Sequence, residues 1–153
     1  MGCDIHALYE RQHIRDYGTG TVFKDWECAG QPDDSRHYAF FGALAGVRRE
    51  DVPVCTWQPF FIAPDGELDG GDACEAFRAM VARWSGDGHT YGSVTLKAMQ
   101  AHTSQLLDWA AKQEPDLSGL LVQWEACIAD MQNIRDYYKL TDDQVRLVFF
   151  FDN

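Results

Sequence analysis

The spacing of apolar residues predicts β-strands at both ends of the chain. Residues 3–12 alternate, so that one face of a strand carries Cys3, Ile5, Ala7 and Tyr9 and the other carries Asp4, His6, Leu8 and Glu10. A glycine-containing turn at 16–21 and a second strand at 21–28 complete a predicted hairpin. The closing segment 145–151 holds three consecutive phenylalanines, which is typical of a central strand buried on both faces.

Helical spacing dominates the middle of the chain. It predicts four helices, at 36–47, 72–84, about 96–113 and about 117–138. Asp34 or Ser35 is the expected cap of the first helix and Thr95 that of the third, while Asp72 and Glu75 resemble a capping box. Residues 48–71 contain three prolines and are expected to be irregular, and 85–93 are expected to form a glycine-rich loop.

Together these elements predict an α+β fold in a single domain that spans residues 1–153. We expect a small, mostly antiparallel sheet, built from the N-terminal hairpin and the C-terminal strand, with about four helices packed on one face. The hairpin and the last strand must share this sheet, because no other segment predicts a comparably strong strand.

Charge and cysteine content narrow the function classes. The formal net charge is −11, so long nucleic acids are not expected partners. No apolar stretch approaches the roughly 20 residues of a membrane span, and no signal peptide is visible, so we expect no membrane partner and a cytoplasmic location. The five cysteines include no Cys-x-x-Cys pair, which favours reduced thiols over a zinc ribbon or a disulfide framework.

The candidate chemistry lies where the chain ends are expected to meet. Asp4 and His6 leave the same face of the first strand, and an antiparallel last strand would bring Asp152 beside them. Asp87 and His89 repeat the Asp-x-His pattern in the glycine-rich segment, which we expect to close over the group. The predicted catalytic residues are therefore Asp4, His6 and His89.

The same residues form a hypothetical metal site. Two imidazoles and up to three carboxylates are a ligand set for zinc, manganese or iron, here Asp4, His6, Asp87, His89 and Asp152. Such a divalent metal would generate hydroxide from bound water at neutral pH. The alternatives are that the two aspartates cap backbone groups while His6 bonds within the sheet, or that the site binds a ligand without metal.

A second group of residues is a candidate anion clamp. Arg36, His37 and Tyr38 open the first predicted helix, Arg48 follows its far end, and Gly88 allows a ligand to approach the backbone closely. The expected ligand is small and anionic, such as a phosphorylated or nucleotide-like molecule. The alternative is that these arginines pair with the abundant surface acids.

Four segments together resemble a family of small proteins encoded in bacteriophage and prophage genomes. They are "MGCDIH" at the start, "RHYAFFGALAGVR" and "DGHTYGSVTL" in the middle, and "VRLVFFFDN" at the end. His37 and Thr90 depart from the family pattern, which has Asn and Ser there, and "VPVCTWQPFF" replaces a Pro-Arg-Gly-Leu-Pro run, which weakens the case for the anion clamp. The resemblance implies a viral accessory protein that works in the cytoplasm of a bacterial host, and it implies no specific activity.

Three functional hypotheses remain open at this point. The first is a metal-assisted hydrolase or phosphodiesterase that acts on a small phosphorylated or nucleotide-derived substrate and counters host defence. The second is a protein that sequesters a nucleotide signal without chemistry. The third is an acidic inhibitor that binds a host protein, and a second copy of the chain is a further candidate partner.

Overall fold

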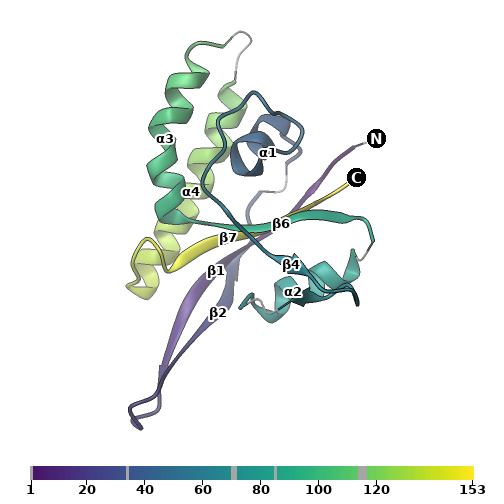
Figure 1. Cartoon of the computed structure of the whole chain (residues 1–153). Helices are drawn as coiled ribbons and strands as arrows, with labels where there is room; N and C mark the ends of the chain where they lie inside the picture. The colour runs from purple at the N-terminus through teal and green to yellow at the C-terminus, as the bar shows by residue number, and fades with distance from the viewer. Residues whose placement is uncertain (1, 34, 70–71, 85, 114–116) are drawn as a thin grey trace.

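The protein is built around a five-stranded antiparallel sheet with strand order β2-β1-β7-β6-β3 (Figure 1). A computed structural model describes residues 2–33, 35–69, 72–84, 86–113 and 117–153. The strands of this sheet are β1 (Ile5–Asp16), β2 (Val22–Gly30), β3 (Gln58–Pro59), β6 (Gly88–Thr95) and β7 (Val145–Asp152). The predicted α+β class, with the N-terminal hairpin and the C-terminal strand in one sheet, is confirmed.

β7 is the central strand, as its phenylalanines predict. It pairs on one side with β1, from Ile5 opposite Phe151 to Arg11 opposite Val145, and on the other side with β6. Every residue of β7 is buried. A strand covered on both faces and paired on both edges tolerates this continuous apolar sequence, because no side of it meets water.

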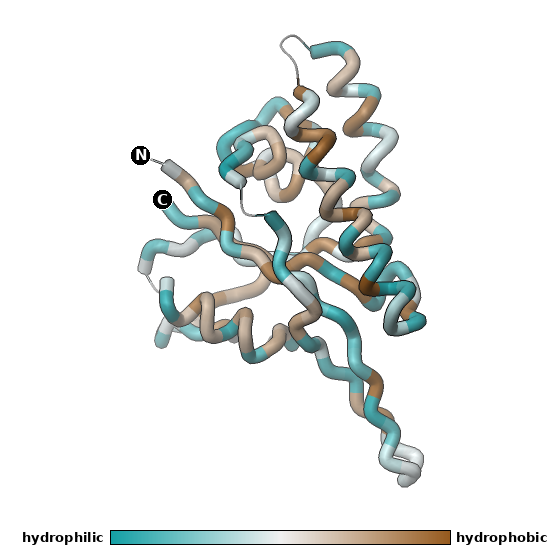
Figure 2. The backbone as a smooth tube through the Cα atoms, turned by 180° about the vertical axis from the view of Figure 1, so that it is seen from behind, coloured by the Kyte–Doolittle hydropathy of each residue, from teal (hydrophilic) through white to brown (hydrophobic). Residues whose placement is uncertain are grey.

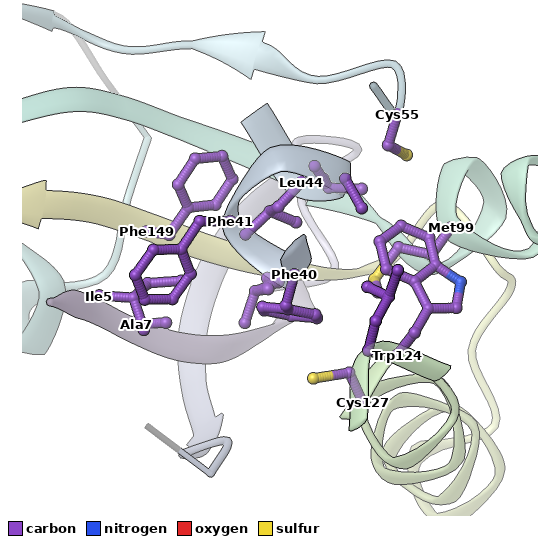
Figure 3. Close-up of a cluster of buried hydrophobic side chains, with 14 of the residues drawn as sticks. Ile5, Ala7, Phe40, Phe41, Leu44, Cys55, Met99, Trp124, Cys127 and Phe149 are labelled. Atoms are coloured by element: carbon purple, nitrogen blue, oxygen red, sulfur yellow. The ribbon is translucent and has the colours of Figure 1, made fainter. Parts of the chain in front are cut away.

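One face of the sheet carries the larger core. Helices α1 (Tyr38–Ala45), α3 (Leu96–Ala110) and α4 (Ser118–Tyr138) pack there against the side chains that β1 and β7 turn toward them (Figure 3). Ile5 and Ala7 of β1 contribute to this core together with Phe149 of β7, as the alternation in residues 3–12 predicts. Cys3 is fully buried in the same cluster, which places it on the face opposite His6.

The prediction that all helices pack on one face is wrong. Helix α2 (Glu75–Arg83) covers the opposite face, where Phe77 and Val81 pack against Leu8, Val148 and Phe150. The small hairpin of β4 (Phe61–Ile62) and β5 (Leu68–Asp69) lies in the segment expected to be irregular. The sheet is therefore buried on both faces, which follows from the apolar residues at both parities of β7.

The described residues of the predicted glycine-rich loop, 86–93, are largely a strand. From Gly88 the segment belongs to β6, which pairs with β7 through a register shift between His89 and Gly92. Thr90 within this bulge has a φ of 56°, a conformation that is uncommon for a residue with a side chain. The glycine and polar residues of this segment are typical of a loop, although the segment forms an interior strand of the sheet.

The helix caps agree with the prediction for α3 but differ from it for α1 and α2. Thr95 caps α3, its hydroxyl oxygen accepting the Ala98 N–H at 3.1 Å. Residue 34, one of the two predicted caps of α1, lies outside the described residues, and Ser35 bonds Asp33 instead. Helix α2 begins after Cys74, whose N–H is taken by the distant carboxylate of Glu10 at 2.6 Å. This cap cannot be read locally, since 64 positions separate the two residues.

The β1–β2 hairpin extends beyond the rest of the sheet (Figures 1 and 2). The β1–β7 ladder ends at Arg11, whereas the β1–β2 ladder continues to Asp16 opposite Val22. We call residues 14–24 the arm. Elsewhere, none of the described helices is long and apolar enough to cross a membrane.

Candidate functional site

The first residues of β1 and the last residues of β7 lie side by side, as predicted. His6 is opposite Phe150, and the Asp152 N–H donates to the Asp4 carbonyl at 3.1 Å. Antiparallel pairing brings the two chain ends to one edge of the molecule (Figure 1). Residues that are almost the whole chain apart in sequence are thereby neighbours.

Asp152 and His6 form the central contact of this edge. Oδ2 of Asp152 lies 2.8 Å from Nε2 of His6, and Oδ1 of Asp152 accepts the Asp4 N–H at 3.1 Å. Asp152 is 7% exposed. The carboxylate therefore both caps a backbone group, as one of the sequence-based alternatives holds, and binds the imidazole. This second role fixes the ring orientation.

Two aromatic rings hold the His6 imidazole in place. The Trp84 ring centroid is 4.5 Å from that of His6, and Phe150 stacks on it at 4.9 Å with an interplanar angle of 22°. Because a carboxylate accepts from Nε2–H, the neutral ring presents Nδ1 as an acceptor. No described residue bonds Nδ1, and the side chain is 19% exposed. His6 is thus an oriented imidazole with one unused nitrogen.

Arg36 and Asp4 complete the group. Nε of Arg36 donates to Oδ1 of Asp4 at 2.6 Å, and the side chains are 51% and 46% exposed respectively. This hydrogen bond lowers the pKa of Asp4, and the positive charge of Arg36 acts in the same direction, while burial opposes both. Asp4 and Asp152 together favour the charged form of Arg36 and raise its pKa. We call Asp4, His6, Arg36 and Asp152 the sheet-end cluster.

His89 does not join this cluster. Its ring stacks on Phe151 at 6.1 Å, and Phe151 contacts Phe41 of α1, whereas His6 stacks on Phe150. Since neighbouring residues of a strand face opposite sides, the two histidines lie on opposite faces of the sheet. Nδ1 of His89 bonds the Thr90 hydroxyl at 2.9 Å, and its Nε2 is buried and has no hydrogen-bond partner among the described residues.

The predicted metal ligands are consequently divided. Asp4, His6 and Asp152 lie together, His89 lies behind the sheet, and Asp87 is exposed in the turn that precedes β6. Among the residues that the structure describes, no group of three or more His, Cys, Asp or Glu side chains is arranged to hold a metal ion.

Of the remaining predicted ligand-binding residues, Gly88 and Arg48 lie near the end of β7. Gly88 is opposite Asp152 in the β6–β7 ladder, and a Cβ there would overlap the Tyr91 hydroxyl. Arg48 reaches the chain end, with Nη2 at 3.5 Å from Oδ1 of Asn153.

His37 and Tyr38 serve the packing of α1 instead. A Cβ at Gly119 of α4 would lie only 2.7 Å from Nε2 of His37, so the close approach of this ring requires glycine. The Tyr38 ring contacts Phe41 at 5.7 Å.

Sequence reasoning missed a second charged cluster on the α2 face. Buried Glu10 pairs with Arg146 at 2.6 Å, and Arg146 also reaches Asp72 at 2.9 Å and lies 4.0 Å over the Trp26 ring. The sequence does contain a sign of this cluster. Glu10 lies on the same strand face as Leu8, and Arg146 interrupts an apolar run, so each strand has a charged residue at a position expected to be buried. Two such charges in paired strands predict a buried ion pair.

The chain matches no protein-family model, no curated protein and no solved structure. The resemblance to a phage-encoded family therefore stays a prediction.

Proposed function

We propose that the sheet-end cluster binds a small phosphorylated or nucleotide-derived ligand and that His6 exchanges a proton with it. The main support is the 2.8 Å contact between Nε2 of His6 and the Asp152 carboxylate, which leaves Nδ1 free to bond a ligand. Trp84 and Phe150 pack against the same ring and hold its orientation. A carboxylate behind an imidazole sets its tautomer and stabilises its protonated form, which is the arrangement of a general acid–base residue.

Arg36 supplies the affinity for an anion. Its pair with Asp4 is about half exposed, and exposed ion pairs contribute only about 0–1 kcal/mol. A phosphate with more charge and more acceptor oxygens can therefore displace the Asp4 carboxylate at low cost and bind the guanidinium through two hydrogen bonds. Arg48 lies at the same edge through its contact with Asn153.

The reaction class that fits is hydrolysis of a phosphate ester. Nδ1 of His6 accepts a proton as a water oxygen attacks phosphorus, the bond to the leaving oxygen breaks, and the proton is returned to that oxygen. The participation of a divalent metal stays a prediction. Parallel assays with EDTA and with added Mn²⁺ or Zn²⁺ test it. Together with the family resemblance, this chemistry supports a viral accessory protein that removes a nucleotide signal of host defence in the bacterial cytoplasm.

The test is incubation with a panel of cyclic mononucleotides and dinucleotides, followed by melting curves and chromatography of the products. Wild type should show a raised melting temperature with at least one member, because a ligand that binds the folded state stabilises it by mass action. Arg36→Gln should lose this shift, and His6→Gln should keep the shift but lose turnover. Arg49→Gln and His13→Gln, outside the cluster, are the matched controls.

Each outcome decides between the hypotheses. A ligand that binds and is recovered intact from wild type replaces hydrolysis by sequestration. If no nucleotide shifts the melting curve under any metal condition, the site does not bind this class of ligand and the proposal fails.

A second candidate function is binding of a basic host protein. It is favoured by a cavity of about 470 Å³ between β2 and the start of α2, in whose lining four carboxylates (Asp25, Glu27, Asp72 and Glu75) outnumber the two basic side chains, Arg15 and Lys24. With a net charge of −11, the chain attracts basic surfaces at long range. Capture of such a partner should weaken steeply as salt is added and should be insensitive to Arg36→Gln.

A further inference from the structure

Two of the five cysteines line the same cavity. Cys28 is exposed near the end of β2, where this strand has returned from the arm, and Cys74 immediately precedes α2. Both belong to the lining of the cavity of about 470 Å³ between these elements. The other three, Cys3, Cys55 and Cys127, are buried in the larger core on the opposite face of the sheet. The sheet therefore separates the Cys28–Cys74 pair from the remaining thiols.

The pairing of β2 with β1 directs Cys28 toward the start of α2. Cys28 is opposite Glu10 in the β1–β2 ladder, and side chains that are opposite each other in an antiparallel pair leave the same face of the sheet. The carboxylate of Glu10 accepts the Cys74 N–H at 2.6 Å. One glutamate side chain, rising beside Cys28, thus reaches the backbone of Cys74.

A second contact joins the same two segments two residues away. Nε1 of Trp26 donates to Oδ2 of Asp72 at 2.9 Å. Side chains two positions apart on a strand share a face, so Cys28 is on the face that carries Trp26. A step of two residues along each segment leads from Trp26 and Asp72 to Cys28 and Cys74, which is the relation expected of two side chains that can meet.

The two thiols differ in reactivity. Burial, together with the weaker effects of Glu10 and Cys28, raises the pKa of Cys74 to about 12, whereas Cys28 is open to solvent. Because the thiolate is the attacking species, an external disulfide reacts first at Cys28. Cys74 is then held beside the new mixed disulfide, and this proximity offsets its small thiolate fraction.

We propose that Cys28 and Cys74 are a modification site at which a small disulfide, such as oxidised glutathione, introduces a reversible intramolecular disulfide. The Cys28 thiolate attacks one sulfur of the reagent, which forms a mixed disulfide and releases one small thiolate. The Cys74 thiolate then attacks the Cys28 sulfur and releases the second. Two protein thiols are oxidised, the small disulfide is reduced to two thiols, and the two protons leave with them.

The bond ties β2 to the start of α2. Helix α2 ends at Arg83, and Trp84, the next residue, packs on the His6 ring. The modification therefore restrains the helix beside the sheet-end cluster without changing any residue of that cluster. A cross-link between residues 28 and 74 also removes conformational freedom from the unfolded chain, so the melting temperature should rise by about 5–10 °C.

The experiment incubates the full chain with oxidised glutathione, blocks the remaining thiols by alkylation and identifies cross-linked peptides by mass spectrometry. Cys28→Ser and Cys74→Ala are compared with wild type. Cys55→Ala is the matched control, because Cys55 is buried outside the cavity. Circular dichroism before oxidation checks that each variant is folded, and melting curves are recorded before and after oxidation.

Wild type and Cys55→Ala should each lose two free thiols, yield a peptide that joins Cys28 to Cys74 and melt at the higher temperature, and dithiothreitol should reverse all three changes. Cys74→Ala should stop at a mixed disulfide on Cys28, and Cys28→Ser should stay reduced over the same period. A mixed disulfide that persists on Cys28 of wild type would overturn the proposal. So would a cross-link between two molecules, a disulfide that involves another cysteine, or wild type that does not react.

Discussion

At the scale of single residues, the sheet-end cluster depends on how each polar group is held. Asp152 is buried and fully engaged by His6 and the Asp4 N–H, whereas Asp4 and Arg36 are about half exposed. The buried His6–Asp152 pair fixes the orientation of the imidazole, whereas a ligand can replace Asp4 in the exposed pair with Arg36. Substitutions at the two pairs should therefore have different consequences.

Asp4 predicts a dependence of stability on pH. Its hydrogen bond with Arg36 lowers the pKa in the folded protein, so the contribution to stability is present above the pKa of the unfolded chain, near 4. That contribution is lost as pH falls through the lower pKa of the folded state. Asp4→Asn should reduce the free energy of unfolding by up to about 1 kcal/mol at neutral pH, and the difference from wild type should vanish in acid.

Urea titrations of both proteins over a series of pH values measure this difference. The exposed substitution Asp108→Asn serves as the control and should show no such trend. A difference between wild type and Asp4→Asn that grows toward acid would contradict the predicted role of the Asp4–Arg36 pair.

The cysteines give a second prediction at this scale. Burial raises the pKa of Cys55 and Cys74 to about 12 and that of Cys127 to about 11, while Cys28 is exposed on β2. Because the thiolate is the reactive form, a disulfide reagent at mildly alkaline pH should modify Cys28 rapidly and these three slowly. Cys28→Ser should remove the fast phase, and a fast phase that survives in this variant would show that the buried cysteines are accessible.

At the scale of elements, the Glu10–Arg146 pair joins β1, β7 and the start of α2. Glu10 is fully buried, and its two carboxylate oxygens bond Arg146 and the Cys74 N–H. Glu10→Gln leaves the buried guanidinium with the more exposed Asp72 as its remaining charge partner, which should cost up to about 3–5 kcal/mol of unfolding free energy. Glu27→Gln disturbs partly exposed pairs with Arg11, His13 and Arg15, and it should cost less than about 1 kcal/mol.

Urea titrations at neutral pH compare these two variants. Equal losses from Glu10→Gln and Glu27→Gln would mean that the Glu10–Arg146 pair is not the buried link between the three elements.

Local sequence predicts much of this architecture but not its long-range polar contacts. The alternation in residues 3–12, the phenylalanines of β7 and the Thr95 cap are each visible within a few residues. The capping of α2 by Glu10 and the strand character of residues 88–95 depend on partners more than 50 positions away. The position of His89 was mispredicted for the same reason, because the face it occupies depends on its register against Phe151.

At the scale of the whole molecule, the fold brings both ends of the chain into one site. His6 and Asp152 are 146 positions apart, and only the pairing of β1 with the central strand joins them. Removal of the Asp152 carboxylate should therefore abolish the site even when the rest of the fold is intact.

Deletion of residues 152–153 tests this dependence. The shortened protein should lose about 1–3 kcal/mol of unfolding free energy, because His6 and the Asp4 N–H lose their acceptor, and it should lose ligand turnover. Deletion of Asn153 alone is the control and should retain both properties. Undiminished turnover after removal of both residues would separate the activity from Asp152.

The most direct test of the account follows the His6 ring nitrogens by long-range proton–nitrogen NMR during titration with the nucleotide that gives the largest melting shift. The account predicts a neutral ring protonated at Nε2 in the free protein, and a ligand-induced change in the Nδ1 signal that Arg36→Gln abolishes. His6 signals that stay unchanged at saturation, while resonances elsewhere in the protein move, would show that the ligand binds away from the sheet-end cluster.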